Sequence, residues 1–350
     1  MRLKEVAQII AGLLPRPVTF MEVCGTHTVN IFRFGLRSLF PAELKLVSGP
    51  GCPVCVTPPE EIDFLLALAR EPGVIIATFG DLVRVPGSKG SLKEARAEGA
   101  QVKIVYSPLE AVELAKAQPQ AKVVFAAVGF ETTAPAVAVA VLEAYRAGLE
   151  NLFFAVSHRT MPQALRALLA SGRVELDGFL LPGHVATITG ASYFEFIATE
   201  FELPAVVAGF TAPQIMKGLY LLARQVADGR REVEIAYTEA VTWEGNVTGQ
   251  QLMRKVFTPC DAHWCGLGLI PQSGLKLKEK YAALDARRAF PLELPPAREP
   301  SGCRCGDILC GRATPKDCPL FGKACTPEHP KGPCMVSSEG TCAAWYAFGS

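Results

Sequence analysis

No apolar run in the sequence reaches the ~18–20 residues that a membrane-spanning helix needs. Charge of one sign is also not in excess, because 35 Lys and Arg oppose 34 Asp and Glu and leave a net charge of +1. This balance gives no reason to expect nucleic acid or acidic lipid as the main partner. The first residues, "MRLKEVAQIIAGLLPRP", resemble a short amphipathic helix and lack the apolar stretch and cleavage site of a signal peptide. We therefore expect a soluble, cytoplasmic protein.

Cysteine is missing from residues 56 to 259, although the chain has twelve cysteines. Three of them lie before residue 60 and the other nine lie after residue 259. A reducing cytosol keeps thiols reduced, so clustered cysteines there favour metal binding or redox chemistry over structural disulfides. In a secreted protein the same cysteines would indicate disulfide bonds, and the missing signal peptide argues against that alternative.

Eight short apolar runs, rich in Val, Ile and Phe, end in glycine or proline. They are nearly continuous rather than alternating, which is typical of strands buried on both faces of a parallel sheet. Helical patterns lie between them, such as 57–73, for which we expect Thr57 to be the cap and Gly73 the stop. This alternation predicts an α/β fold. The expected strands are 18–25, 44–51, 74–81, 102–108, 122–131, 152–158, 178–184 and 204–210.

The length of 350 residues predicts two or three domains. We expect two small doubly wound parallel-sheet domains, 1–120 and 121–245, that face a cleft, and a turn-rich C-terminal iron–sulfur domain, 246–350, against which the N-terminal helix can pack. Short motifs resemble one another between the halves, for example "VCGTH" and "GFETT". This likeness fits an internal pseudo-repeat, and it equally fits chance resemblance among strand–helix turns.

Four motifs fall at predicted strand ends, where ligands of open parallel sheets bind: "VCGTH", "GPGCPVC", "GFETTAP" and "PGHV". They carry three polar candidates besides cysteine. His27 and His184 are either structural hydrogen-bonding groups or functional residues of the cleft. Glu131 is either an acid at a helix N-terminus or a carboxylate that orients or protonates a ligand.

Three thiols are expected near one another. Cys24 ends a strand and the pair Cys52 and Cys55 follows the next one, so neighbouring strands would place all three in one cleft. Gly49 and Gly51 allow another backbone or a ligand to come close. Because Cys55 just precedes a predicted helix, we expect the helix dipole to lower its pKa. The alternative is that these thiols are buried and inert, whereas three soft thiolates would suit iron or Cu(I).

The segment from residue 303 to residue 342 holds seven cysteines in forty residues and few large apolar side chains. Such a segment lacks a core of its own, and a bound metal centre would stabilise its fold. Its last four cysteines, Cys318, Cys325, Cys334 and Cys342, are separated by six, eight and seven residues. These intervals are too long and too even for paired zinc ligands and favour an iron–sulfur cluster. Zinc, disulfides and free thiols remain alternatives.

Several strings together resemble the HypD family of nickel–iron hydrogenase maturation factors. The match runs in order from about residue 20 to the C-terminus, and "GPGCPVC" and "CMVSSEG" are its most specific parts. One departure is Cys265, where the resemblance predicts arginine. The strings that carry the resemblance are "CGTHTVNIFRFGLRSLFP", "SGPGCPVCVTP", "GFETTAP", "LPGHVATITG", "WCGLGLIPQSG" and "CPLFGKACTPEHPKGPCMVSSEGTCAAWY".

The resemblance implies a cytoplasmic assembly scaffold rather than an enzyme. Proteins of this family pair with the small chaperone HypC and hold the iron of the Fe(CN)2CO unit, to which HypE, supplied by HypF, delivers cyanide. Cys24, Cys52 and Cys55 match the functional N-terminal cysteines of the family. The resemblance also implies a 4Fe–4S cluster, with Cys305 as a reserve ligand. The ligands we expect for the cluster are Cys318, Cys325, Cys334 and Cys342.

A mechanism follows as a hypothesis. Cys24, with a cysteine of HypC, holds the iron, while Cys52 and Cys55 bind it directly or cycle between dithiol and disulfide. Electrons from the cluster would keep the iron low-valent for CO and CN binding. The alternative functions are a cluster-dependent thiol–disulfide oxidoreductase and a zinc-stabilised binding module.

Overall fold

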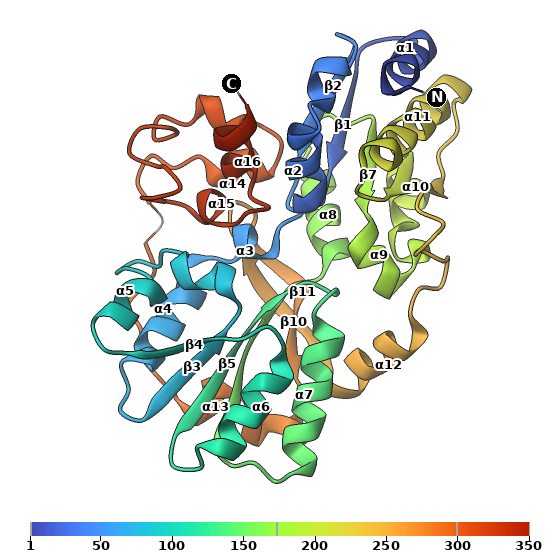
Figure 1. Ribbon diagram of the computed structural model, residues 1–350. Coiled ribbons are helices and arrows are strands. Elements are labelled where there is room, and N and C mark those ends of the chain that lie inside the picture. The colour runs from blue at the N-terminus through green and yellow to red at the C-terminus, as the bar shows by residue number, and fades with distance from the viewer. Residues whose placement is uncertain (1, 173, 299, 350) are drawn as a thin grey trace.

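The computed structural model describes residues 2–172, 174–298 and 300–349, and it shows an α/β protein with two separate parallel sheets (Figure 1). The first sheet has the strand order β2-β1-β7-β8-β9, and the second has the order β4-β3-β5-β6. The first sheet consists of β1 (Val18–Glu22), β2 (Leu44–Ser48), β7 (Gly178–Pro182), β8 (Ala205–Ala208) and β9 (Val233–Ile235). The second consists of β3 (Val74–Thr78), β4 (Gln101–Ile104), β5 (Lys122–Gly129) and β6 (Leu152–His158).

All eight expected strands are present, and the expected class, two parallel-sheet units with a turn-rich cysteine region, is confirmed. If the strands are renumbered within each sheet, the orders become 2-1-3-4-5 and 2-1-3-4. These orders reverse between β1 and β7 in one sheet and between β3 and β5 in the other, and ligands bind outside the carboxyl ends of strands at such points. The two units are therefore alike in topology.

The chain crosses between the sheets. It leaves the first sheet after β2, builds the whole second sheet and returns to the first at β7. The first sheet therefore draws on residues 18–48 and 178–235, and the expected division at residues 120 and 245 coincides with neither sheet. Likeness between motifs does not follow the sheets either: "SGPG" and "LPGH", which also resemble each other, both end strands of the first sheet.

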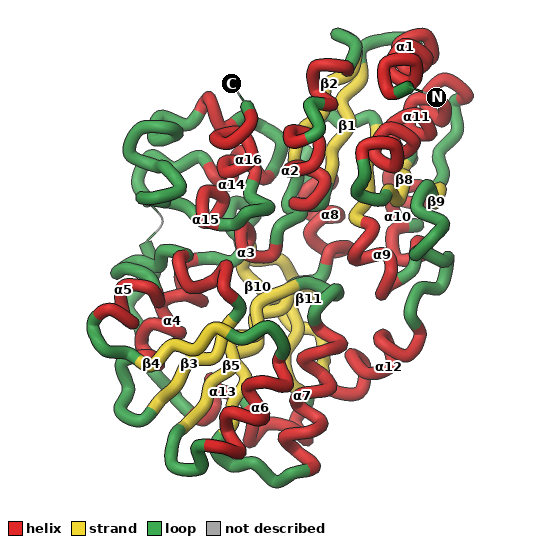
Figure 2. Tube along the Cα trace, viewed as in Figure 1, coloured by secondary structure: helices red, strands yellow, loops and turns green. Residues whose placement is uncertain are grey.

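Helices cover both faces of each sheet (Figures 1 and 2). Successive strand residues point to opposite faces, so Phe20 packs with α1 and α11, while Met21 packs with α8. Around the first sheet lie α1 (Leu3–Leu13), α2 (Gly25–Arg33), α8 (Met161–Ala170), α9 (Gly183–Thr189), α10 (Phe196–Phe201) and α11 (Ala212–Asp228). Around the second lie α4 (Pro59–Ala69), α5 (Leu92–Ala97), α6 (Pro108–Ala117), α7 (Ala134–Arg146) and α13 (Ala286–Ala289). No helix in the described part of the chain has the length and apolarity of a membrane span.

The helix expected in 57–73 begins later than the sequence pattern predicted. Thr57 ends the single-turn helix α3 (Pro53–Val56), so Pro58 takes the N-cap position of α4. The helix also ends earlier than predicted, at Ala69 with Arg70 as its C-cap, so Gly73 is not its stop. Gly73 lies in the turn before β3, with a left-handed φ of 74°.

A β-hairpin that the sequence analysis did not predict lies where the two sheet units meet (Figure 2). It is formed by β10 (Phe257–Trp264) and β11 (Gly268–Leu277) and follows α12 (Val247–Val256). Thr160 N–H donates to Ser273 O at 2.8 Å, and Cys265 N–H donates to Val56 O at 2.9 Å. The hairpin thus joins the start of α8 to the helix that carries the CxxC pair.

The cysteine-rich segment is turn-rich, as expected, and contains the short helices α14 (Cys305–Leu309), α15 (Pro333–Val336) and α16 (Thr341–Phe348). It packs on the edge of the first sheet. The ring of Trp345 meets that of Phe32 at 5.1 Å between centroids, and the Gly311 backbone lies against Met21 and Val47.

Candidate functional site

Cys24 lies just beyond the carboxyl end of β1, where the strand order of the first sheet reverses. The loop after the neighbouring strand β2 presses against it. Gly25 N–H donates to Gly51 O at 3.1 Å, and a Cβ added at Gly51 would lie only 2.2 Å from the Cys24 nitrogen. Only glycine allows this approach, which confirms the expected close contact at this position. The loops of Cys24 and of the CxxC pair are therefore in direct contact.

The two thiols of the CxxC pair, Cys52 and Cys55, are in contact with each other. Cys52 is the N-cap of α3, and Cys55 lies within that helix. The Cys52 sulfur accepts the N–H of Cys55 at 3.3 Å, and the two sulfurs, both free thiols, are 2.6 Å apart. Burial raises the pKa of Cys55 well above its usual range, so the predicted lowering is wrong. The helix dipole is outweighed because the thiol is withdrawn from water.

Cys24 also lies at a helix N-terminus, because it is the N-cap of α2. Backbone N–H groups of Thr26 and His27 lower its pKa, but burial outweighs them and raises the pKa to about 12. Beside it, buried Glu22 accepts the Cys24 N–H at 3.2 Å, and burial raises the pKa of Glu22 to about 7. The sequence analysis did not identify Glu22. Its place as a carboxylate at the end of a buried strand could have indicated a functional residue.

Glu339 is a second residue that the sequence analysis missed. It comes from the "CMVSSEG" segment and reaches the loop of Cys24, where it accepts the hydroxyl of Thr26 at 2.5 Å. A Cβ added at Gly25 would lie 2.5 Å from the Glu339 Cβ. The cysteine-rich segment therefore closes over the N-terminus of α2.

His27 and His184 both contact the Phe210 ring, with centroid distances of 5.1 Å and 3.8 Å respectively. The Nε2 atom of His27 is 3.0 Å from Gly209 O, and burial lowers the pKa of this histidine to about 4. The pKa of His184, whose side chain is more exposed, is also lowered, because the packed surroundings remove part of its contact with water. Both imidazoles are therefore neutral at pH 7 and link α2, α9 and the loop after β8.

The C-terminal cysteines surround a small cavity. In the described residues 2–172, 174–298 and 300–349, no group of three or more His, Cys, Asp or Glu side chains is arranged to hold a single metal ion. The expected four cysteines nevertheless line one space together with the reserve Cys305 and with Cys303. The cysteines that line the cavity are Cys303, Cys305, Cys318, Cys325, Cys334 and Cys342.

The CxxC pair contacts this cavity through Cys334. Cys55 and Cys334 interact through their thiols, and the Cys334 sulfur lies 2.8 Å from that of Cys305. Cys52 Sγ also lies 3.4 Å from the hydroxyl of Ser337. Sulfur atoms therefore follow one another from the N-terminal dithiol to the wall of the C-terminal cavity.

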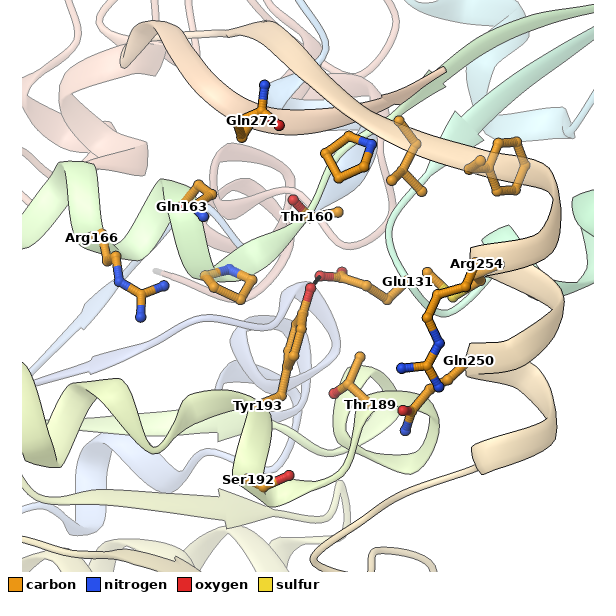
Figure 3. A pocket seen from close by; sticks show the side chains of 15 residues that line it. Glu131, Thr160, Gln163, Arg166, Thr189, Ser192, Tyr193, Gln250, Arg254 and Gln272 are labelled. Atoms are coloured by element: carbon orange, nitrogen blue, oxygen red, sulfur yellow. Dashed lines mark hydrogen bonds between the residues drawn. The ribbon is translucent and has the colours of Figure 1, made fainter. Parts of the chain in front are cut away.

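Glu131 lies at the carboxyl end of β5 and lines a different cavity, which none of the cysteines lines (Figure 3). Its Oε1 accepts Met161 N–H and Tyr193 O–H, both at 2.8 Å, while its Oε2 has no partner among the described residues. Burial raises the pKa of Glu131 to about 7. The structure thus separates Glu131 from the thiols.

Cys265, the departure from the family pattern, lies beside the cysteine-rich segment. The backbones of Gly266 and Gly306 touch, since a Cβ added at Gly306 would be 2.5 Å from the Gly266 Cα. This contact brings the preceding residues, Cys265 and Cys305, together, and their thiols interact.

Replacing Gly306 by alanine should therefore separate the hairpin from the cysteine-rich segment. Because the obstacle is backbone, we expect the free energy of unfolding to fall by about 1–3 kcal/mol. Urea unfolding would measure this change. Gly80→Ala is the control, since its added Cβ meets only Ile104 Cγ2 at 3.7 Å. Equal unfolding midpoints for the two variants would contradict the prediction.

Known proteins resemble the chain over its whole length. It matches the family described as "HypD: Hydrogenase formation hypA family" over residues 2–349. It is 46% identical over 351 residues to "Hydrogenase maturation factor HypD" of Azotobacter vinelandii, covering 98% of this chain and 93% of that protein. The protein of the same name from Escherichia coli (strain K12) is 43% identical over 347 residues, covering 99% of this chain and 93% of the relative.

Proposed function

Because the chain belongs to the HypD family of hydrogenase formation proteins, we propose that it is a scaffold on which the Fe(CN)2CO unit of nickel–iron hydrogenase is assembled. The iron of that unit is the cargo, and HypC is the partner that holds it jointly in the cytoplasm. HypE, supplied by HypF, is the transient partner that delivers cyanide.

The continuous arrangement of thiols is the observation that supports this proposal most. Cys24 lies at the switch point of the first sheet, and the loop carrying Cys52 and Cys55 is pressed against it through Gly51. Soft thiolates are suitable ligands for low-valent iron. In the proposal Cys24 holds the iron together with a HypC thiol, while Cys52 and Cys55 bind it or exchange electrons with it.

The C-terminal cavity fits a 4Fe–4S cluster. Six cysteines line it, and no histidine, aspartate or glutamate does among the residues that the structure describes, so its donor set is the all-thiolate set that such clusters use. A bound cluster would supply one-electron chemistry. The four ligands we propose are Cys318, Cys325, Cys334 and Cys342. Cys55 interacts directly with Cys334, which lines this cavity, so the dithiol is in contact with the cavity wall.

His27 and His184 act as positioning residues in this proposal. Both imidazoles pack against Phe210, and Glu22 fixes the Cys24 loop by accepting the Cys24 N–H. Neutral imidazoles add no charge beside the thiols. Glu131 has no role at the thiols in this proposal, because it lines a different cavity.

A cluster-dependent thiol–disulfide oxidoreductase is the second candidate, because the two CxxC sulfurs are only 2.6 Å apart. Both thiols are buried, however, so a disulfide substrate would have to displace part of the fold to reach them. Disulfide turnover without HypC would favour this function. A zinc-stabilised module would be colourless and would contain zinc after anaerobic purification.

Cys24→Ala tests the scaffold. We expect the anaerobic complex of this variant with HypC to lose most of its CN and CO infrared bands, because a thiolate ligand of the iron is removed. Loss of the buried sulfur should cost the fold only about 1 kcal/mol, which thermal unfolding can verify. Cys260→Ala is the matched control, since that half-buried cysteine lies on the hairpin. Bands at full strength in Cys24→Ala would exclude Cys24 as an essential ligand.

A further inference from the structure

The cavity that Glu131 lines has more positively than negatively charged side chains in its wall. It lies among α8, α12, the hairpin and the turn that carries Tyr193 (Figure 3). Among the described residues that line it, Glu131 is the only acidic one, whereas two arginines, Arg166 and Arg254, line it together with hydroxyl and amide side chains. The rest of the wall is apolar, so the polar part of the cavity offers hydrogen-bonding groups and positive charge beside an apolar surface. The apolar lining residues are Pro162, Met253, Phe257, Pro259 and Leu275.

The two arginines differ in what they already bind. Arg166 donates two hydrogen bonds to Glu200, at 2.8 and 2.6 Å, so its charge is balanced. The guanidinium of Arg254 has no ion pair within the described residues. Figure 3 shows it extending from α12 beside Gln250, on the opposite side of the cavity from Arg166. One positive charge in the wall is thus unpaired.

Glu131 offers a further unused group. Its Oε1 is satisfied by Met161 N–H and Tyr193 O–H, but its fully buried Oε2 has no partner among the described residues. A buried polar atom without a partner is costly and calls for an explanation such as a ligand. A protonated carboxyl would present an O–H donor at Oε2.

We propose that this cavity binds a small oxyanion, such as an organic carboxylate or phosphate, held by Arg254 and by a hydrogen bond donated from the carboxylic acid of Glu131. The inference does not depend on the proposed scaffold function, because it concerns a cavity that no cysteine lines.

Because anion binding is linked to the protonation of Glu131, the proposal predicts the direction in which the affinity changes with pH. Burial raises the pKa of free Glu131 to about 7, so near neutrality the carboxyl is partly protonated. An anion that needs the acid form must bind together with a proton whenever Glu131 is ionised. The affinity should therefore be about tenfold lower at pH 8 than at pH 6. The other charged or titratable groups around the cavity are Tyr193, Arg166 with Glu200, and Arg254.

Calorimetric titration of the full chain with benzoate, and separately with sulfate as a tetrahedral oxyanion, tests the proposal, because neither probe changes its own protonation between pH 6 and pH 8. We expect at least one of them to bind more tightly at pH 6 than at pH 8, with proton uptake visible in buffers of different ionisation enthalpy. The anion that binds identifies the class. Binding by neither anion, or tighter binding at pH 8, would overturn the proposal; the second result would mean that ionised Glu131 accepts a hydrogen bond.

Three variants sharpen the test. Glu131→Gln keeps an acceptor for Met161 and Tyr193 and places an N–H donor at Oε2, so anion binding should persist and lose its pH dependence. Arg254→Gln should weaken binding roughly 10- to 100-fold, the range expected for a lost hydrogen bond to a charged group. Lys255→Gln, next to it on α12 and outside the cavity, removes the same charge and should change little. If Arg254→Gln and Lys255→Gln weakened anion binding equally, the anion would be held only by non-specific charge attraction. That result would overturn the proposal.

Discussion

Gly51→Ala is expected to destabilise the protein and to separate its N-terminal thiols. The added Cβ would lie 2.2 Å from the Cys24 nitrogen and 2.3 Å from the Val23 carbonyl carbon. Both atoms are backbone of the first sheet, so no flexible side chain can move aside. Overpacking of this kind costs about 1–3 kcal/mol and sometimes more. The hydrogen bond from Gly25 N–H to Gly51 O would be lost as the loops part.

Thermal and urea unfolding of the purified chain measure this effect. Iron binding with HypC should fall too, because Cys24 would no longer adjoin the CxxC loop. Gly12→Ala is the matched control: nothing lies within 4 Å of its added Cβ, and in a helix the change should stabilise by about 0.5–1 kcal/mol. An unfolding midpoint of Gly51→Ala at or above that of the parent would show that the two loops can separate without cost.

Cys334→Ser is expected to have the second large effect, the loss of most cluster iron. Its sulfur is buried, lies 2.8 Å from Cys305 and interacts with Cys55 and Cys342, so it is placed between the dithiol and the cavity. A hydroxyl is a poor replacement for a soft thiolate ligand. Since the cysteine-rich segment has few large apolar side chains, losing a bound metal centre should also loosen its fold.

Iron and labile-sulfide content, with the visible colour of anaerobic protein, measure this loss. Cys260→Ser should keep full iron content, because this cysteine does not line the cavity. Cys305→Ser separates the two proposed ligand sets: iron is retained if Cys305 is only a reserve ligand. Full iron in Cys334→Ser would remove this residue from the set.

The sequence was sufficient to predict strands that are buried on both faces, because such strands form continuous apolar runs. It did not reveal the hairpin, because prolines at 259 and 271 argue against strands and the burial of β11 does not alternate regularly. The three-residue edge strand β9 was also missed. Sheet membership could not be predicted either, because a helix can lead the chain back to either sheet.

The neighbourhood of the N-terminal thiols was predictable because it depends on two consecutive strands. The raised pKa of Cys55 was not predictable, because it is caused by burial in the folded protein, which outweighs the lowering effect of the hydrogen bond with Cys334. The contacts of Glu339 and Cys265 are long-range, and local patterns do not encode them.

The interrupted first sheet has a consequence for folding during synthesis. β1 pairs with both β2 and β7, so its two sides are covered only after residue 182 has been made, whereas the second sheet is complete at residue 158. Domains generally fold as units while the chain is being synthesised. We expect the second sheet to form first, while the N-terminal segment remains open. The three thiols then stay accessible to solvent until the C-terminal segment leaves the ribosome and covers them.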